Sequence, residues 1–454
     1  MEKKKRQVVL SPTKIIMLGF LLGAIIGAFI LWSPIAQRPG VNLHFDDALF
    51  VSTSSVCVTG LSTVNIGETF SFLGQLVLLG LIQVGGLGVV TFTTAIFLMF
   101  HRRLSLRNRM LIQNAYNLET LSQLGTLTKR IIKATLLLEG IGALGYATVF
   151  IPEFGVKGIW YSVFHAVSAF CNAGIDLLGG NSLCAYRDNV IINATTMFLI
   201  VMSGLGFPVY WEIIRVFKTR KSSGKRSMIS RLNIQAKLVL TMTVILIVGG
   251  AVLTFLFEYS NPNTIGNLST GGKIQASLFQ SITLRTAGFA TIDQANFSEV
   301  SCLVYFVLMF IGGSPAGTAG GVKTVTVAML LVFLLDDITG RREADVFKRK
   351  VDDRYLRRSV AIITFSFTVL LVLTTCLMFV EKSNFLDTMY EMTSAIATVG
   401  LSRGLTGELS FVGKIIVIMA MYLGRIGPIT LALAFNATKK RGKTSFAESK
   451  IVVG

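Results

Sequence analysis

Eight long stretches with almost no charged residues constrain this 454-residue chain more than any other feature. Each is about as long as the roughly 20-residue helix that crosses the hydrocarbon core of a bilayer. Charged residues make up only 15% of the chain, whereas soluble domains carry about 25%. The stretches predict an all-α polytopic membrane protein with eight transmembrane helices, and they exclude a single water-soluble globule. They lie at 15–32, 71–100, 131–150, 190–211, 238–257, 300–335, 359–380 and 415–438.

The positions of lysine and arginine indicate which side of the membrane each connection faces. The connections 1–14, 101–133, 215–237, 336–358 and 436–454 hold 33 of the 43 basic residues, and the alternate connections hold 7. By the positive-inside rule, the basic connections and both termini are cytoplasmic. The net charge of +19 then mainly reflects the topology. The basic connections are expected to contact membrane lipid, and binding of nucleic acid is not expected. The outward connections hold 13 acidic residues, an excess that would concentrate cations at the outer mouth.

Few residues are available for a metal centre or for covalent chemistry. The five cysteines show no C-x-x-C spacing, and the chain has only three histidines. Neither a zinc site nor a disulfide framework is predicted. The spans hold no nucleophile, carboxylate pair or metal cluster, and no connection has a dinucleotide-binding fold. The sequence therefore predicts no enzyme activity and no covalent cofactor.

Four similar tetrapeptides mark an internal repeat in the outward connections. They are Val58-Thr59-Gly60-Leu61, Asn172-Ala173-Gly174-Ile175, Thr286-Ala287-Gly288-Phe289 and Thr398-Val399-Gly400-Leu401. Their glycines are 114, 114 and 112 residues apart. Each follows an apolar segment too short to span, which predicts four helix, re-entrant pore loop and helix repeats around a central pore. Short pore helices are expected at 46–56, 160–170, 274–284 and 386–396.

The repeat also predicts how the chain is divided. The expected parts are 1–14 as cytoplasmic N-terminus, 15–100, 129–217, 236–335 and 359–438 as pore repeats one to four, and 439–454 as cytoplasmic C-terminus. A glycine recurs at a similar offset in the second helix of three repeats, at Gly85, Gly312 and Gly424. Repeat two departs from this pattern, since its glycine, Gly204, lies further along.

Glycine allows backbone carbonyls to point at a pore axis, where they replace the water around a cation. No acidic side chain lies in the tetrapeptides, so backbone dipoles would favour a monovalent cation over a divalent one. The candidate filter residues are Val58, Thr59, Gly60, Asn172, Ala173, Gly174, Thr286, Ala287, Gly288, Thr398, Val399 and Gly400, with the ion at the four glycines. The side-chain oxygens of Thr59, Asn172, Thr286 and Thr398 would either join this filter or bond to the pore-helix backbone.

The segment 312–321 has five glycines and a proline in ten residues, which disfavours a regular helix. It forms either a kink between two packed half-helices or a flexible barrier that lines a water-filled cavity. Arg425 is the only charge in 415–438, and an intramembrane arginine is a site candidate because its burial in lipid is costly. The candidate site residues of these two segments are Gly312, Gly313, Ser314, Gly317, Thr318, Gly320, Gly321 and Arg425.

Three further charges lie near the spans. Lys323 is expected either to reach the cytoplasmic water or to cap backbone carbonyls. Arg285 would repel a cation if it faced the axis, so it is expected to face away, with Glu391 as its candidate partner. Glu139 has Lys133 as its candidate partner.

The four tetrapeptides, the G-G-S-P-A-G-T-A-G-G run and the G-R-I-G-P helix together resemble the Trk/Ktr/HKT superfamily of potassium transporters. The chain is most similar to the bacterial KtrB ion-translocating subunit, over nearly its whole length. This resemblance implies potassium uptake across a bacterial plasma membrane, a filter lined by the four glycines, and a gate loop at 312–321 beside Arg425. In that family a serine in the first loop is associated with sodium selectivity, so Gly60 implies potassium.

The resemblance also implies partners, namely a homodimer docked on a ring of soluble KtrA-like nucleotide-binding subunits. The alternative for the basic connections is contact with anionic lipid alone. Sodium remains open as an activator ion. A secondary cation or solute symporter with broken helices is the competing function, although such proteins usually show two large repeats rather than four short ones.

Overall fold

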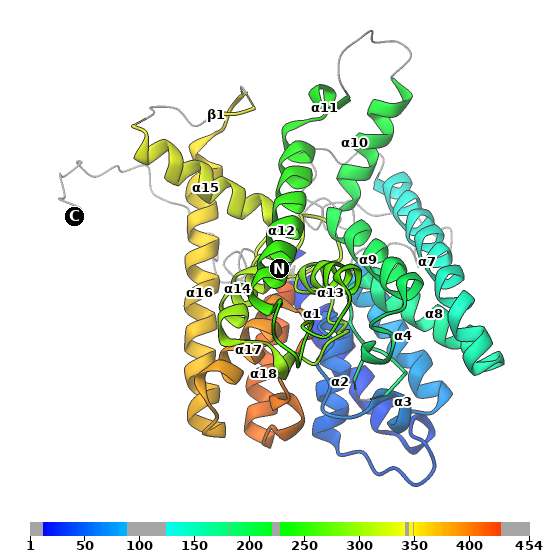
Figure 1. Cartoon of the computed structure of the whole chain (residues 1–454). Helices are drawn as coiled ribbons and strands as arrows, with labels where there is room; N and C mark the ends of the chain where they lie inside the picture. Colours follow the sequence, from blue (N-terminus) through cyan, green and yellow to red (C-terminus); the bar gives the residue numbers. More distant parts are fainter. Residues whose placement is uncertain are drawn as a thin grey trace, which may run out of the picture.

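The computed structural model describes residues 12–88, 124–179, 181–219, 228–340, 345–347 and 349–427. This part of the chain is mainly helical (Figure 1). Its strands are β1 (Asp345–Val346) and β2 (Arg349–Lys350), which pair as a small antiparallel hairpin.

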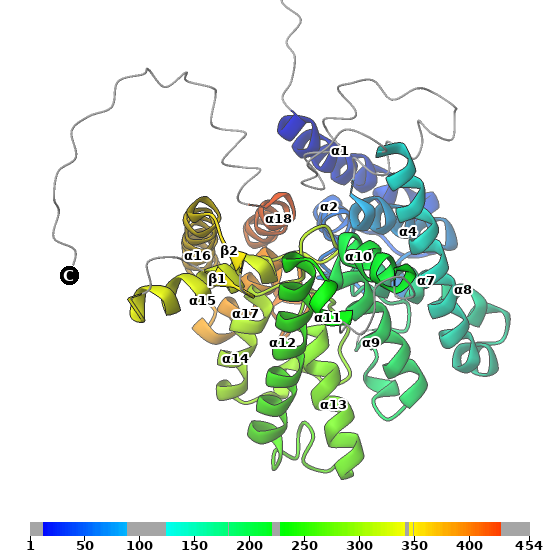
Figure 2. The same ribbon diagram turned by 90° about the horizontal axis from the view of Figure 1, so that it is seen from above.

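Four groups of helices follow one another along the chain. Group one contains α1 (Pro12–Trp32), α2 (Phe45–Cys57) and α4 (Phe72–Leu87), and group two contains α7 (Leu124–Phe154), α8 (Val156–Cys171) and α9 (Val190–Leu205). Group three contains α12 (Ile234–Glu258), α13 (Thr270–Thr283) and α14 (Glu299–Phe310), and group four contains α16 (Asp353–Glu381), α17 (Phe385–Ala397) and α18 (Phe411–Ile426). Seen from above, the groups surround a common centre (Figure 2).

The remaining helices connect or extend these groups. They are α10 (Phe207–Lys218), α11 (Met228–Arg231) and α15 (Thr324–Ile338), together with the short α3 (Ile66–Thr69), η1 (Pro34–Ala36), η2 (Cys184–Tyr186), η4 (Gln294–Asn296) and η5 (Leu405–Glu408).

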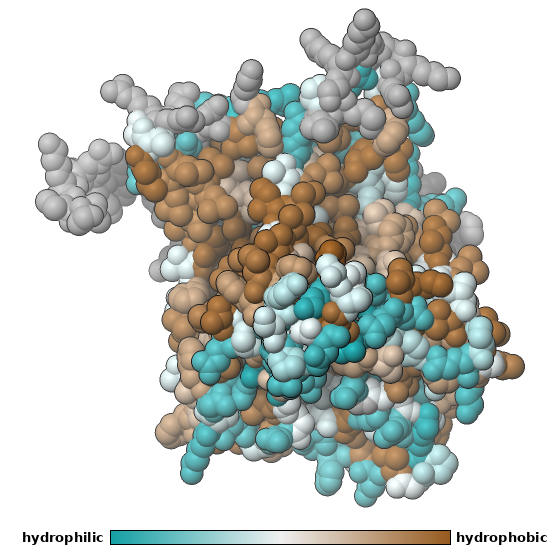
Figure 3. All heavy atoms as spheres, viewed as in Figure 1, coloured by the Kyte–Doolittle hydropathy of each residue, from teal (hydrophilic) through white to brown (hydrophobic). Residues whose placement is uncertain are grey.

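The first helix of each group is long and apolar enough to cross a membrane. These stretches are Lys14–Trp32, Thr128–Phe154, Ile234–Glu258 and Asp353–Glu381. Their outer faces expose large apolar side chains such as Leu137, Val244 and Leu256, which a lipid environment would cover. Figure 3 shows apolar side chains gathered over much of the upper part of one face, and hydrophilic ones below them.

The short helix of each group, α2, α8, α13 or α17, is called an inner helix here because its C-terminal half is buried. Side-chain caps define where two of them begin, since Ser269 accepts from the Gly272 N–H and Asn384 from the Asp387 N–H. In α2, the first turn instead carries Asp46 and Asp47, whose charge complements the positive end of the helix dipole.

The recurring glycines of the second helices allow close contact with the inner helices. A methyl group added at Gly85 would collide with the Val56 carbonyl oxygen, and one at Gly424 with the Ile396 carbonyl oxygen. Val56 and Ile396 each lie four residues before the glycine of their own tetrapeptide. The shared offset in the sequence therefore reflects one packing contact repeated in groups one and four.

The second helices break at glycines, which corrects the expectation of an unbroken helix over 190–211. Helix α9 ends at Leu205, Gly206 has a φ of 84°, and α10 leaves at 90° to α9. Helices α4 and α18 likewise end at Gly88 and Gly427, with φ of 81° in both. This left-handed region favours glycine because it has no Cβ. In group three, α14 ends just before the 312–321 segment.

Several predicted segments fall wholly or partly outside the described residues. These are the N-terminal 1–11, residues 89–123, 220–227, 341–344 and 348, the end of the last predicted span at 428–438 and the C-terminal 439–454. The side of the membrane assigned to the basic connections therefore stays a prediction.

Candidate functional site

Each inner helix leads into its tetrapeptide through a left-handed residue. The residues two before the four glycines are Val58, Asn172, Thr286 and Thr398, with φ of 57°, 60°, 65° and 51°. Three of these are β-branched, for which this conformation is strained. Such strain persists only where the surroundings impose it, and it concentrates at functional sites. The same conformation at four equivalent positions indicates one backbone design used four times.

The four glycines close a ring, and we call them the ring glycines. In each, φ is positive, at 103° in Gly60, 64° in Gly174, 80° in Gly288 and 95° in Gly400. A methyl group added to any of them would collide with the carbonyl oxygen just before the next ring glycine. These pairs are Gly60 with Ala173 at 2.6 Å, Gly174 with Ala287 at 2.7 Å, Gly288 with Val399 at 2.7 Å, and Gly400 with Thr59. The last pair joins group four to group one, so the order of groups around the ring is one, two, three, four.

The side-chain oxygens of Thr59, Asn172, Thr286 and Thr398 do not all make the same contacts. The hydroxyls of Thr59, Thr286 and Thr398 are buried and have no hydrogen-bond partner among the described residues. Asn172 differs, since its Oδ1 accepts a hydrogen bond of 2.7 Å from Ser203 on α9. The expected alternative of bonds to the inner-helix backbone is therefore wrong for the three threonine hydroxyls. Unpartnered buried hydroxyls are rare in folded proteins, and each needs an explanation such as water or an ion.

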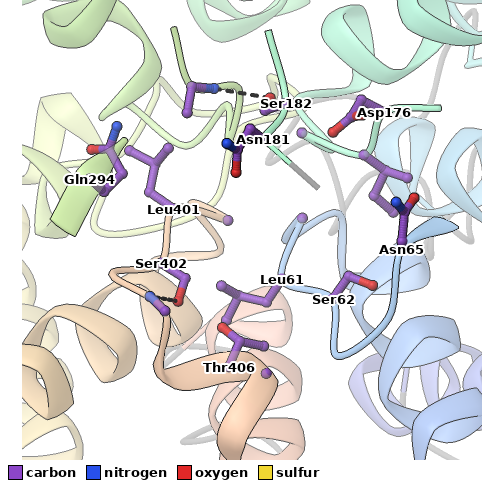
Figure 4. Close-up of a pocket in the computed structure, with 18 of the residues that line it drawn as sticks. Leu61, Ser62, Asn65, Asp176, Asn181, Ser182, Gln294, Leu401, Ser402 and Thr406 are labelled. Atoms are coloured by element: carbon purple, nitrogen blue, oxygen red, sulfur yellow. Dashed lines mark hydrogen bonds between the residues drawn. The ribbon is translucent and has the colours of Figure 1, made fainter. Parts of the chain in front are cut away.

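A cavity of about 470 Å³ lies on the side of the ring that carries the connections predicted to face outward, and it is lined by residues of all four groups (Figure 4). We call it the outer cavity. The ring glycines form part of its lining, as do the residues that directly follow three of them, Leu61, Ile175 and Leu401. Asp176, Asp293 and Arg403 supply its charged groups. The sequence reasoning ended at the tetrapeptides and missed this lining, although the residues that follow each tetrapeptide would have indicated it.

Two contacts tie the wall of the outer cavity to the inner helices. Thr63 donates to Asp47 on α2 at 2.6 Å, and Arg403 forms an ion pair with Asp387 on α17 at 2.7 Å. In both pairs the first residue lies three positions after its ring glycine and the second 13 positions before it. Arg403 also donates to the Gln294 carbonyl at 2.9 Å, which holds its guanidinium against the wall.

Asp176 is the titratable group of the cavity closest in sequence to a ring glycine. Burial raises the pKa of this carboxyl from 3.8 to about 6, although hydrogen bonds from the Leu178 and Gly179 N–H groups oppose the shift. Its carboxylate is therefore ionised at neutral pH and becomes neutral in mild acid.

The 312–321 segment forms a loop that approaches the ring away from the outer cavity. Its ends are joined by a parallel bridge between Ile311 and Val322. The Ser314 N–H donates to the Gly204 carbonyl at 2.9 Å, and the Thr318 hydroxyl donates to the Phe170 carbonyl of α8 at 3.3 Å. A methyl group at Gly320 would collide with the Thr398 hydroxyl, two residues before Gly400.

Two cations hold this loop by its carbonyls. Arg425 donates from Nη1 to the Thr318 carbonyl at 2.6 Å and from Nη2 to the Gly85 carbonyl of α4. It therefore links the loop to groups one and four. Lys323 donates to the Ala319 and Gly320 carbonyls at 2.7 and 3.3 Å. Of the two roles expected for Lys323, the structure therefore shows the capping of backbone carbonyls.

The other candidate gate residues pack tightly in the same loop. A methyl group at Gly312 would collide with the Gly320 carbonyl, one at Gly313 with Ala319, and one at Gly317 would lie 2.7 Å from the Ser203 carbonyl. Gly321 has a φ of 64°, which again favours glycine. The loop thus has close contacts on several sides rather than the form of a simple kink.

Two expected ion pairs are wrong. Both carboxylate oxygens of Glu391 accept from hydroxyls, Oε2 from Ser402 at 2.7 Å and Oε1 from Thr406, so Arg285 is not its partner. Arg285 is buried, and its Nε has no partner among the described residues. Glu139 accepts from Gln83 of α4 at 3.0 Å instead of pairing with Lys133. In both cases a neutral hydrogen-bond partner replaces the expected charge.

Comparison with known proteins identifies the family. The TrkH model, described as a cation transport protein, matches residues 23–445. The potassium/sodium uptake protein NtpJ of Enterococcus hirae is 36% identical over 100% of this chain and 99% of the relative. The Ktr system potassium uptake protein B of Vibrio alginolyticus is 38% identical over 92% of this chain and 90% of the relative. Its counterpart in Bacillus subtilis is 36% identical over 97% and 96%.

A solved structure supports the fold. The crystal structure of the potassium transporter TrkH from Vibrio parahaemolyticus superposes with a TM-score of 0.74, covering 96% of this chain and 87% of that one. Its sequence is 17% identical, so the likeness speaks for the fold alone. The predicted all-α polytopic membrane fold, the superfamily and a transporter in place of an enzyme are all confirmed. The chain therefore belongs to the TrkH family of cation transport proteins.

Proposed function

We propose that this protein takes up potassium across the plasma membrane through a channel-like pore whose selectivity filter is the ring of four glycines. The observation that carries the proposal is the closure of the ring, in which each glycine packs against a carbonyl of the next group. Backbone carbonyls brought together around an axis can replace the hydration shell of a monovalent cation. The ion is held at Gly60, Gly174, Gly288 and Gly400, by the backbone of their tetrapeptides.

The names of the relatives support potassium as the main substrate. Two are potassium uptake proteins of Ktr systems, and the third is a potassium/sodium uptake protein. Sodium therefore enters the proposal as an activator or a second permeant ion. The tetrapeptides carry no acidic side chain, so the filter discriminates by backbone dipoles rather than by fixed charge.

The 312–321 loop is proposed as the gate. It lies against the inner helices close to the ring, and Arg425 and Lys323 hold it by three of its carbonyls, while Arg425 also binds the Gly85 carbonyl of α4. Its barrier has a steric part, the tightly packed loop, and an electrostatic part, the Arg425 guanidinium. A loop that lines water can move at membrane depth without leaving backbone groups unsatisfied.

The proposed assembly is a homodimer with a ring of KtrA-like nucleotide-binding subunits on the cytoplasmic side, where both termini also lie. The names of the Ktr relatives, which describe parts of a system, support a separate partner chain. A ligand of that ring would shift the gate only by binding its two states with different affinity. Helix α15, which directly follows the loop and Lys323, is the direct mechanical connection.

Ion flux through the purified protein in liposomes tests this function. We expect influx of potassium and rubidium to exceed that of sodium, with little transport of organic solutes. Saturable transport of an organic solute coupled to a cation would instead favour a secondary symporter. Co-purification with a soluble ring, and flux that depends on its nucleotide, tests the assembly separately. Flux that ignores every soluble fraction and nucleotide would contradict it.

A further inference from the structure

Four buried hydroxyls behind the ring divide the groups into two kinds. In groups one and four, the hydroxyl accepts from the ring glycine itself: the Gly60 N–H donates to Ser54 Oγ and the Gly400 N–H to Ser394 Oγ, each at 3.0 Å. Both serines are buried and lie six residues before their glycine.

In groups two and three, the hydroxyl has the opposite role and donates to a carbonyl beyond the glycine. Ser168 Oγ donates to the Ile175 carbonyl at 2.6 Å, and Thr283 Oγ1 donates to the Phe289 carbonyl at 2.5 Å. Ser168 has the same position as Ser54, six residues before its ring glycine, yet it makes a different bond. Thr283 is one residue closer to its glycine, since the residue six before Gly288 is Ile282, which has no hydroxyl.

These bonds set the direction of the carbonyls because all described peptide bonds are trans. In a trans peptide the N–H and the preceding C=O point to opposite sides. When Ser54 holds the Gly60 N–H toward the inner helix, the Thr59 carbonyl points toward the axis. When Ser168 holds the Ile175 carbonyl toward the inner helix, that oxygen is withdrawn from the axis.

Group three secures the same orientation from a second side. The Ala290 N–H, in the peptide whose carbonyl is that of Phe289, donates to Ser182 Oγ at 3.1 Å. The equivalent carbonyls of groups one and four belong to Leu61 and Leu401, and neither has a hydrogen-bond donor within the described segments. Groups four and one are neighbours around the ring, as are groups two and three.

We infer that the outer end of the filter is two-sided: a cation entering from the outer cavity is held off the axis by the Leu61 and Leu401 carbonyls. Ser168 and Thr283 are the positioning residues that keep the opposite carbonyls, those of Ile175 and Phe289, out of the pore. This inference rests on the proposed function and specifies its entry site. With two protein carbonyls in place of four, the entering ion keeps part of its water, so discrimination falls mainly to the carbonyls just before the glycines.

The decisive measurement is the position of rubidium in the wild-type protein. Rubidium replaces potassium and gives an anomalous X-ray signal, and the wild-type chain avoids any question of folding. We expect an outer peak displaced from the axis toward Leu61 and Leu401. An outer peak centred on the axis would overturn the inference while leaving the proposed function intact. No peak at the ring, together with no potassium flux, would defeat the proposed function itself.

Substitutions of the hydroxyls provide a second test. In Ser168→Ala and Thr283→Val the freed carbonyls can turn inward, so external caesium should inhibit potassium influx at a concentration lower by about threefold or more. Ser54→Ala and Ser394→Ala should instead raise sodium influx relative to potassium, because the Thr59 and Val399 carbonyls lose their orientation. The conservative Thr283→Ser should restore the wild-type caesium value. If all four hydroxyl variants changed both measurements alike, the two-sided site would be wrong.

Discussion

At the scale of single residues, the ring glycines satisfy two requirements at once. Their φ angles lie between 64° and 103°, a region that side chains disfavour, and a neighbouring carbonyl occupies the place of a Cβ. Either requirement alone would leave alanine as a poor but tolerable substitute. Together they mean that any side chain must move the carbonyl of the next group, so damage at one glycine spreads to its neighbour in the ring.

Gly60→Ser is expected to weaken the preference for potassium over sodium. The new Cβ would lie 2.6 Å from the Ala173 carbonyl oxygen, which must turn or shift. We expect a change of about tenfold in the flux ratio, equivalent to roughly 1.4 kcal/mol. Gly407→Ala is the matched control, since Gly407 also lines the outer cavity but has open space around it. An unchanged ratio in Gly60→Ser at normal protein levels would contradict the role of the ring.

Asp176 should make uptake sensitive to external pH. Its pKa of about 6 means that the carboxylate is ionised at pH 7.5, where it attracts cations, and mostly protonated at pH 5. We expect potassium influx at low concentration to fall by about threefold over this range. Asp176→Asn should give the low value at both pH values.

The control for that experiment is Asp188→Asn, which removes an exposed outer carboxylate. This variant should keep the wild-type pH profile. The other titratable residues that line the cavity, Cys184, Asp293 and Arg403, remain in both variants. A pH dependence that survives in Asp176→Asn would contradict the assignment to Asp176.

The spacing of the tetrapeptides was sufficient to find the residues of the ring, because four glycines in register are rarely explained by packing alone. The sequence did not predict the hydrogen-bond partners of the buried charged residues. It paired Arg285 with Glu391 by charge, whereas the hydroxyls of Ser402 and Thr406 satisfy that carboxylate. Hydroxyls are common and carry no charge, so a sequence does not indicate which of them approaches a buried acid.

At the scale of helices, the breaks of the second helices explain what the sequence could not show. Gly88, Gly206 and Gly427 stand in apolar stretches, where a single glycine more often serves close helix packing. Only the 312–321 loop has enough glycine to be recognised from composition. The structure shows that Gly206 faces this loop, since a methyl group there would collide with the Pro315 carbonyl. The break in α9–α10 and the loop therefore fit together.

Gly206→Ala is expected to displace the loop and raise potassium flux. The substitution places a side chain at a φ of 84° and against Pro315, so both the α9–α10 bend and the loop must adjust. Gly204→Ala is a closely matched control, two residues away with no atom within 4 Å of an added methyl group. Equal potassium flux in the two variants would show that the α9–α10 bend does not control the gate loop.

Arg425→Ala is expected to raise potassium flux several-fold, because it removes a positive charge and both carbonyl contacts that fix the loop. Arg425→Lys keeps the charge but cannot span Thr318 and Gly85 with one planar group, so an intermediate flux is expected. The measurement is flux per folded protein, with folding checked by thermal unfolding. Loss of transport by a well-folded Arg425→Ala protein would contradict the gate assignment.

At the scale of the whole molecule, the ring must close between the first and last groups, about 350 residues apart in sequence. Lys414 at the start of α18 provides one such link, since its Nζ lies 2.6 Å from both Asp46 Oδ2 and Asp47 Oδ1 on α2. The spacing of the tetrapeptides predicted the four groups, but it carries no information on which helix ends meet. Contacts such as the one between α18 and α2 form only when the four groups close the ring in the folded protein.

Lys414→Met is therefore expected to loosen the contact between groups four and one. All three side chains are partly buried, and removing the cation leaves two carboxylates close together without a positive partner. Loss of one member of a partly buried ion pair costs about 1–3 kcal/mol, between the values for exposed and fully buried pairs, so the unfolding temperature in detergent should fall by a few degrees. Lys157→Met, at an exposed lysine on α8, is the control and should unfold like the wild type. Adding Asp46→Asn and Asp47→Asn to Lys414→Met should recover part of the loss, because the uncompensated charges are then gone. If the triple variant were less stable than Lys414→Met alone, the carboxylates would have a stabilising role apart from Lys414, and the closure of the ring would depend on other contacts.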